Sequence, residues 1–162
     1  FLDSDDIWSC EKLERQIDFM RKERIAFSFT SYCLIDEAGS YLHRTIRAPR
    51  EVTYESMLTG NRIGCSTVML DIEKLGKIVM PEVRHEDYAT WLQILKRGYV
   101  GRGLAQVLTA YRVSSGSLSR NKLKSALWTW NIYRNVEKLP VQKAILSFLA
   151  YCIHGVRRYY LT

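Results

Sequence analysis

The feature that most constrains the fold of this 162-residue chain is that the spacing of its apolar residues changes repeatedly along the sequence. Segments rich in β-branched and aromatic residues, typical of strands, alternate with segments whose apolar residues recur every three or four positions, typical of helices. Strands are expected at residues 26–36, 41–47, 65–70 and 107–113, the first two joined as a hairpin by the turn at 37–40. This alternation predicts a mixed α/β fold.

The helical segments have their own signals. The first helix is expected to begin after Ser9, which would cap it, and to carry Leu13, Ile17 and Met20 on its apolar face up to about residue 24. A short helix is expected at 53–58, and a longer one is expected to end at Gly98. Two more helices are expected at 123–133 and, after a proline, at 140–153. The predicted order is a mixed α/β part followed by two helices.

The formal charge of +7 is unevenly distributed along the chain. Eight basic residues and one acid, Glu137, follow Ser119, so this last segment carries the whole positive excess, and residues 1–119 are balanced. A basic chain is a candidate for nucleic-acid binding. The balanced charge of residues 1–119 and the lack of a DNA-binding or RNA-binding motif argue against that use, so we expect no nucleic-acid partner.

The four cysteines are widely scattered and form no CxxC pair, so neither a zinc site nor a disulfide framework is indicated. We interpret them as reduced thiols and expect a cytoplasmic protein. No apolar run approaches the eighteen or so residues that span a bilayer, and no amino-terminal signal sequence is recognised. The chain opens on residues that resemble the end of a buried strand, so we expect it to be a fragment.

Three carboxylates directly follow this apolar strand end, in the sequence FLDSDD at residues 1–6. Holding them together costs electrostatic energy that a divalent cation would offset, since Mg²⁺ is commonly held by one or two carboxylates together with substrate phosphates. The pattern therefore suggests a site for a metal and a diphosphate. The alternative is a solvated acidic loop that leads into the Ser9 helix.

A second acidic pair, Glu86 and Asp87, lies at the start of the helix that contains Trp91. Acids at this position commonly interact with the helix dipole and have only a structural role. A carboxylate on an element separate from a metal site could instead act as a general base. The sequence alone leaves both interpretations open.

Ordered blocks over essentially the whole chain resemble family 2 glycosyltransferases of the GT-A fold, with the greatest likeness to bacterial enzymes that build teichuronic acid, capsule and other surface polysaccharides. The blocks are FLDSDDIW, KLERQIDFM, FSFTSY, GCSTVML, RHEDYATWLQILKRG and AYRVSSGSLS. The resemblance implies a nucleotide-diphospho-sugar transferase fold of which this chain is the carboxy-terminal half, with a mixed sheet. It also implies an inverting, metal-dependent transfer of a sugar from a nucleotide-diphosphate donor to a saccharide or lipid-linked acceptor.

The resemblance assigns roles to particular residues. Asp3 and Asp5 fall on the family's DxD motif, in which the last Asp binds Mg²⁺ or Mn²⁺ and Asp6 is a candidate helper. Asp87 falls on the base of the ED motif, with Glu86 beside it. One further residue, Arg112, could offset charge on the donor diphosphate, and the acceptor side is expected at Gly64, Cys65, Ser66 and Thr67. Many relatives have a histidine shortly after this arginine, whereas serines follow here, so no histidine ligand is expected.

The same resemblance predicts the domain organisation. Residues 1–119 would form the acceptor and metal-binding half of the catalytic domain, and residues 120–162 a basic helical extension. A nucleotide-binding half would precede them, so we expect exposed apolar surface on this chain and no activity from it alone.

The segment after Ser119 combines an apolar helix with basic and aromatic residues, as interfacial helices do. It is expected either to lie on the anionic inner face of the cell membrane or to pack as an ordinary helix on the catalytic domain. Two other functions are alternatives to catalysis: a noncatalytic carbohydrate-binding module, and a basic peripheral-membrane assembly module.

Overall fold

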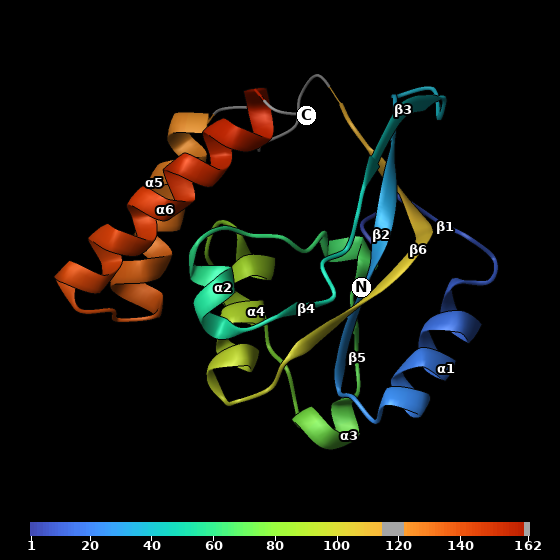
Figure 1. The fold of residues 1–162 in the computed structure, drawn as a ribbon, viewed down its shortest axis with the longest axis horizontal. Coiled ribbons are helices and arrows are strands. Elements are labelled where there is room, and N and C mark those ends of the chain that lie inside the picture. Colours follow the sequence, from blue (N-terminus) through green and yellow to red (C-terminus); the bar gives the residue numbers. More distant parts are fainter. Residues whose placement is uncertain (115–121, 161–162) are drawn as a thin grey trace. The chain divides into compact units, whose positions relative to one another are not determined.

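The computed structural model describes residues 1–114 and 122–160, except for the side chains of 156–160. It has a mixed α/β architecture with one six-stranded sheet (Figure 1). The chain divides into two compact units, which we describe separately. Unit 1 comprises residues 1–52, 62–78 and 99–117, and unit 2 comprises residues 53–61, 79–98 and 118–162.

The sheet of unit 1 is built around two parallel strands, β2 (Phe27–Ile35) and β6 (Gly101–Arg112), which pair from Ser28 with Arg102 to Ile35 with Arg112. All other pairings are antiparallel. Two strands pair with β2 and two with β6: β3 (Tyr41–Ile46), β5 (Met69–Leu70), β1 (Ile7–Trp8) and β4 (Glu51–Val52). The predicted mixed sheet and the predicted hairpin of β2 and β3 are confirmed.

Two strand predictions need correction. Residues 65–70 form a 3-10 turn, Cys65–Thr67, followed by the two residues of β5, rather than one continuous strand. Strand β6 begins at Gly101, six residues before its predicted start. A Cβ atom on Gly103 would lie 2.0 Å from the carbonyl oxygen of Pro49, so glycine is needed there for the close approach of residues 48–50. A strand pattern cannot reveal such a contact between distant segments.

Helix α1 (Lys12–Glu23) lies where it is predicted, but its buried face is different. The residues that it buries are Lys12, Gln16 and Met20, whereas Leu13 and Ile17 are exposed. The predicted Ser9 cap is also wrong, because Glu11 occupies the N-cap position and no side chain caps the helix. A second helix of unit 1, α3 (Ile72–Leu75), is capped by Asp71.

The amine of Lys12 is fully buried, although no carboxylate pairs with it among the described residues. Its Nζ atom donates to Gln16 Oε1 at 2.7 Å and to the Thr67 carbonyl at 3.5 Å, and it lies 4.3 Å from the centre of the Trp8 ring. Burial lowers the pKa of Lys12 to about 8, because removal from water disfavours the charged form.

Unit 2 is helical. Its helices are α2 (Tyr54–Leu58), α4 (Glu86–Lys96), α5 (Lys122–Asn131), a π-helical turn at Ile132–Val136, and α6 (Val141–Tyr160). The hydroxyls of Tyr88 and Tyr133 are 3.1 Å apart in its core and donate to the carbonyls of Met57 and Leu58, each at 2.6 Å. These bonds tie α2 to α4 and to the π-helical turn. Every helix predicted in this part of the chain is confirmed in position.

The structural units do not follow the division expected near residue 119. Helices α2 and α4, with the acidic pair of Glu86 and Asp87, group with the helices that follow residue 121. The division into a metal-binding half and a basic extension concerns function, and it stays a prediction.

The buried amine of Lys12 predicts a dependence of stability on pH. The folded-state pKa of about 8 lies below the value of about 10.4 expected in the unfolded chain, so between these values the unfolded state binds more protons and stability rises with pH. In the unmodified protein, this titration should raise the free energy of unfolding by roughly 2 kcal/mol between about pH 7 and about pH 9.5, and Lys12→Met should remove that rise.

Urea denaturation of both proteins at a series of pH values measures this difference. An equal pH dependence in the variant and the unmodified protein would contradict a buried, protonatable amine. Lys22→Met, at an exposed position on the same helix, is the matched control and should leave the dependence unchanged.

Candidate functional site

The acidic residues predicted from the sequence lie on two separate elements, and each is described within its own unit. Asp3, Asp5 and Asp6 occupy the loop before β1 in unit 1. Glu86 and Asp87 occupy the first turn of α4 in unit 2. Among the described residues, no three His, Cys, Asp or Glu side chains come together in a group that could hold a metal by themselves.

The acidic loop is a tight turn that presents two carboxylates and buries the third. The Asp6 N–H donates to the Asp3 carbonyl at 3.1 Å, and β1 follows at once, with Ile7 opposite Ala110 near the end of β6. Asp3 and Asp5 are exposed, whereas Asp6 is 9% exposed. The two residues expected to bind metal therefore face water, and the expected helper points into the protein.

Asp6 anchors the loop to the end of β6. Its Oδ1 atom accepts a hydrogen bond from the Arg112 N–H at 2.9 Å, while its Oδ2 atom is buried without a hydrogen-bond partner in the described structure. Burial raises the pKa of Asp6; the nearby Ser66 hydroxyl and the Arg112 N–H oppose this rise, and the carboxylates of Asp5 and Asp3 add to it. A positive charge near this loop would favour the ionised form of Asp6.

Arg112 reinforces this anchor with its side chain. The guanidinium donates from Nε to the Asp5 carbonyl at 2.8 Å and from Nη1 to the carbonyls of Asp36 and Glu37, both at 2.9 Å. The planar guanidinium thus connects the acidic loop to the turn between β2 and β3. The structure places Arg112 next to the predicted metal residue, where it holds the backbone of Asp5; its expected contact with a donor diphosphate stays a prediction.

The predicted acceptor-side residues lie against the same loop. Ser66 Oγ accepts a hydrogen bond from the Asp3 N–H at 3.0 Å, and the Ser66 carbonyl accepts one from Trp8 Nε1 at 2.6 Å. Thr67 Oγ1 donates to the Gly64 carbonyl at 2.6 Å, which closes the 3-10 turn. Ser66 therefore connects the turn of residues 64–67, which contains Cys65, to the acidic loop, a role that the sequence does not predict.

Asp87 is half-buried at the start of α4. Its Oδ2 atom accepts a hydrogen bond from Asn61 Nδ2 at 3.4 Å, which fixes one side of the carboxylate. Asn61 lies just after α2 and is not among the site residues predicted from the sequence. Glu86 is exposed beside Asp87. Its carbonyl accepts a hydrogen bond from Thr90 Oγ1 at 2.7 Å, which reinforces the first turn.

The segment before this acidic pair has an unusual backbone. His85 takes a left-handed conformation with φ 60°, uncommon for a residue other than glycine, and so turns the chain sharply into α4. Its Nε2 atom lies 3.3 Å from Ser125 Oγ, and its ring meets the Trp128 ring edge-on at 5.3 Å. Burial lowers the pKa of His85, and the neighbouring Glu86 opposes this shift. Contacts with α5 thus hold the turn in place.

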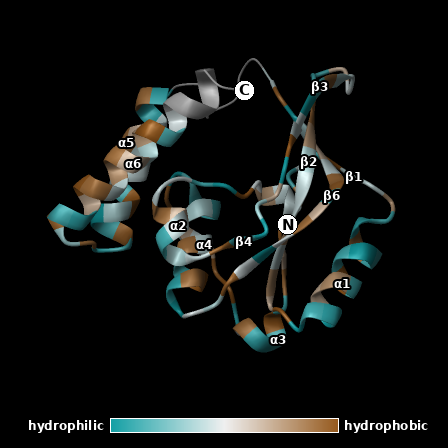
Figure 2. Cartoon of the chain, in the orientation of Figure 1, coloured by the Kyte–Doolittle hydropathy of each residue, from teal (hydrophilic) through white to brown (hydrophobic). Residues whose placement is uncertain are grey.

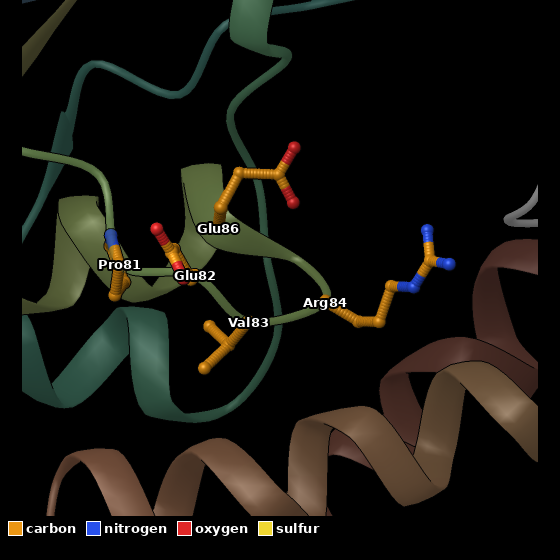
Figure 3. Close-up of a pocket in the computed structure, with 5 residues that line it drawn as sticks. All are labelled: Pro81, Glu82, Val83, Arg84 and Glu86. Atoms are coloured by element: carbon orange, nitrogen blue, oxygen red, sulfur yellow. The ribbon is translucent and has the colours of Figure 1, made fainter.

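An open hollow borders the acidic pair within unit 2. Figure 3 shows the side chains of Glu86 and Arg84 extending away from the backbone of this segment, where their charges are accessible. The residues that line the hollow are Pro81, Glu82, Val83, Arg84 and Glu86.

No model of a known protein family matches the sequence. The chain is 44% identical over 159 residues to TuaG of Bacillus subtilis, a protein named for teichuronic acid biosynthesis and glycosyl transfer. It is 36% identical over 156 residues to WfaP and over 160 residues to WfgD, two Escherichia coli proteins named as glucosyltransferases that use UDP-Glc and α-D-GlcNAc-diphosphoundecaprenol.

These matches cover 98%, 96% and 98% of this chain, and 63%, 61% and 62% of TuaG, WfaP and WfgD. The chain therefore spans somewhat less than two thirds of the length of these relatives. Over nearly its whole length, the chain is homologous to bacterial glycosyltransferases, among them a protein named for teichuronic acid biosynthesis.

Proposed function

We propose that this chain forms part of an inverting, metal-dependent family 2 glycosyltransferase of the GT-A fold that acts in surface-polysaccharide biosynthesis. The observation that carries the proposal is the homology of 96–98% of the chain to named glycosyltransferases. The arrangement of the acidic residues supports it. One anchored loop exposes the carboxylates of Asp3 and Asp5, and a separate helix start holds the carboxylate of Asp87.

The acidic loop fits a hard divalent cation shared with a diphosphate. Asp3 and Asp5 offer exposed carboxylate oxygens, and no hydrogen bond occupies either side chain among the described residues. Two carboxylates suffice when the substrate phosphates supply further oxygen ligands, as is common for Mg²⁺. Asp5, with Asp3 as its neighbour, would hold the Mg²⁺ or Mn²⁺ ion. Such an ion would neutralise negative charge on the departing nucleoside diphosphate.

The residues around this loop would keep Asp5 in position during the reaction. Arg112 holds the Asp5 carbonyl and Asp6 holds the Arg112 N–H, so both sides of the loop are attached to the end of β6. A preorganised loop does not have to be ordered when the donor binds, which lowers the cost of reaching the transition state. The charge of Arg112 would also favour the anionic donor.

Asp87 would act as the general base. Its carboxylate would accept the proton of an acceptor hydroxyl while that oxygen forms a bond to the anomeric carbon, opposite the bond that breaks to the diphosphate. The hydrogen bond from Asn61 would help to hold this carboxylate in position. Glu86 and residues 64–67 are proposed to border the acceptor.

The names of the relatives suggest the substrates. WfaP and WfgD are named as β-1,3-glucosyltransferases that use UDP-Glc and a lipid-diphosphate-linked GlcNAc. UDP-glucose carries its sugar in the α configuration, so a β product corresponds to inversion. We therefore propose a UDP-sugar donor and a lipid-linked saccharide acceptor, with the catalytic domain at the cytoplasmic side of the membrane, where nucleotide sugars are available.

Asp5→Asn tests the metal assignment in the full-length protein. The substitution keeps the size of the side chain and removes its charge, so we expect the fold to persist and metal-dependent turnover to be lost. The measurement compares sugar transfer at a series of Mg²⁺ and Mn²⁺ concentrations with that of Asp18→Asn, an exposed acid on α1. Near-normal rates of Asp5→Asn with either ion would show that Asp5 is not the metal residue.

Asp87→Asn tests the base. Removal of a general base typically lowers turnover about a hundredfold or more, and the affinity for the donor should change much less. The matched control is Glu73→Gln, which neutralises an exposed acid at the start of α3. An unchanged kcat for Asp87→Asn would show that Asp87 has only a structural role at the helix start.

A further inference from the structure

Helix α6 exposes its apolar side. Four of its residues are largely accessible to water: Ile145 at 45%, Leu146 at 68%, Leu149 at 54% and Ile153 at 55%. We call these four residues the α6 stripe. Figure 2 shows apolar residues distributed along α6 in the hydropathy colouring. A helix of a protein in water normally turns such residues toward the core, so the α6 stripe needs an explanation.

The exposure follows from the way in which α6 packs within unit 2. At 100° per residue, the α6 stripe spans an arc of roughly 100° and a length of about 12 Å along the helix. The opposite side carries the packing contacts. Ala144 is fully buried there, and the Phe148 ring contacts the rings of Trp130 at 5.4 Å and Tyr151 at 6.0 Å. Within unit 2, the aromatic side of α6 therefore faces the protein and the aliphatic side faces out.

The segment that contains α6 is basic, and Lys143 of α6 pairs with the exposed Glu55 of α2 at 3.0 Å. The segment after Ser119 contains a single acid, Glu137, and that acid is 4% exposed. Its Oε2 atom accepts hydrogen bonds from Tyr54 at 2.6 Å and from Lys96 at 3.0 Å, so its charge is compensated inside unit 2. Lys138 is exposed just before α6. Arg157 and Arg158 belong to its last turns, but their side chains lie outside the described residues.

We propose that α6 lies on an anionic lipid bilayer, parallel to its surface, with the α6 stripe inserted among the headgroups and the basic residues of this segment facing acidic lipids. An apolar row on a helix of a basic segment is a combination that binds membrane surfaces, because burial of the row and attraction to the lipid charge add. None of the helices in the described ranges is long and apolar enough to span a membrane.

The charge of this segment favours a lipid bilayer, rather than a second copy of the chain, as the partner of the α6 stripe. Residues 120–162 carry a net charge of +7, so two such segments placed face to face would repel each other, whereas a bilayer rich in anionic lipid attracts both. This proposal does not depend on the reaction proposed above, because membrane binding is measured without any substrate. A negative result for membrane binding would therefore not contradict the proposed reaction, and a negative result for the reaction would not contradict membrane binding.

The test is sedimentation of the full-length protein with vesicles of phosphatidylcholine mixed with phosphatidylglycerol, and with vesicles of phosphatidylcholine alone. The variant Leu146→Gln/Leu149→Gln removes the centre of the α6 stripe at exposed positions, so folding should be preserved. We expect it to bind the mixed vesicles at least about tenfold more weakly. The control Ile72→Gln changes a residue on α3 that is also 68% exposed, and it should bind like the unmodified protein.

A second variant, Leu149→Trp, keeps the apolar character of the α6 stripe. It should retain binding, and the added indole should shift the fluorescence emission to shorter wavelength when mixed vesicles are present. The proposal would be overturned if the double variant bound mixed vesicles as well as the unmodified protein does, or if the unmodified protein bound both kinds of vesicle equally. It would also be overturned if mixed vesicles did not shift the emission of Leu149→Trp. So would self-association of the unmodified protein that the double variant abolishes, because the α6 stripe would then be an interface between copies.

Discussion

The attachment of the acidic loop to the end of β6 is the interaction on which the proposed site depends. A buried carboxylate, Asp6, accepts a hydrogen bond from the backbone of Arg112, and the side chain of Arg112 returns to the backbone of Asp5. The acidic loop and the end of β6 are thus attached to each other through both residues. A buried carboxylate is costly unless both of its oxygens are hydrogen-bonded. Only one oxygen of Asp6 has a hydrogen-bond partner among the described residues, and two exposed acids lie next to it. This is an environment that a cation would stabilise.

The hairpin and helix α4 were predictable from the sequence because their signals are local. The turn between β2 and β3 contains a glycine at positive φ, Gly39, and the apolar residues of α4, such as Trp91 and Leu95, are buried on the expected face. Short motifs also select the acidic residues of the candidate site, because they identify residue types, but the roles of these residues stay predictions. The motifs did not reveal that Asp6 is buried in this loop whereas Asp5 is exposed.

The wrongly predicted face of α1 has a physical cause that also applies to α6. Helical spacing shows which residues share a face, but not whether that face is covered. In α1 the covered face holds Lys12 and Gln16, whose polar ends bond to each other and to Thr67, while Leu13 is exposed. In α6 the aromatic contacts of Phe148 decide which side packs, and the aliphatic side is left outside. Contacts between distant segments, which no local pattern encodes, determine both outcomes.

The central proposal is an inverting displacement, with Asp5 as the metal residue and Asp87 as the base. The configuration of the new glycosidic bond tests this most directly, because a single displacement at the anomeric carbon must reverse it. Transfer from an α-linked UDP-sugar by the full-length protein, followed by proton NMR of the product before it can equilibrate, reports the coupling constant of the anomeric proton. For a glucosyl donor, we expect the large coupling of a β-linked product. An α-linked product would contradict the account, since retention needs a different use of these carboxylates.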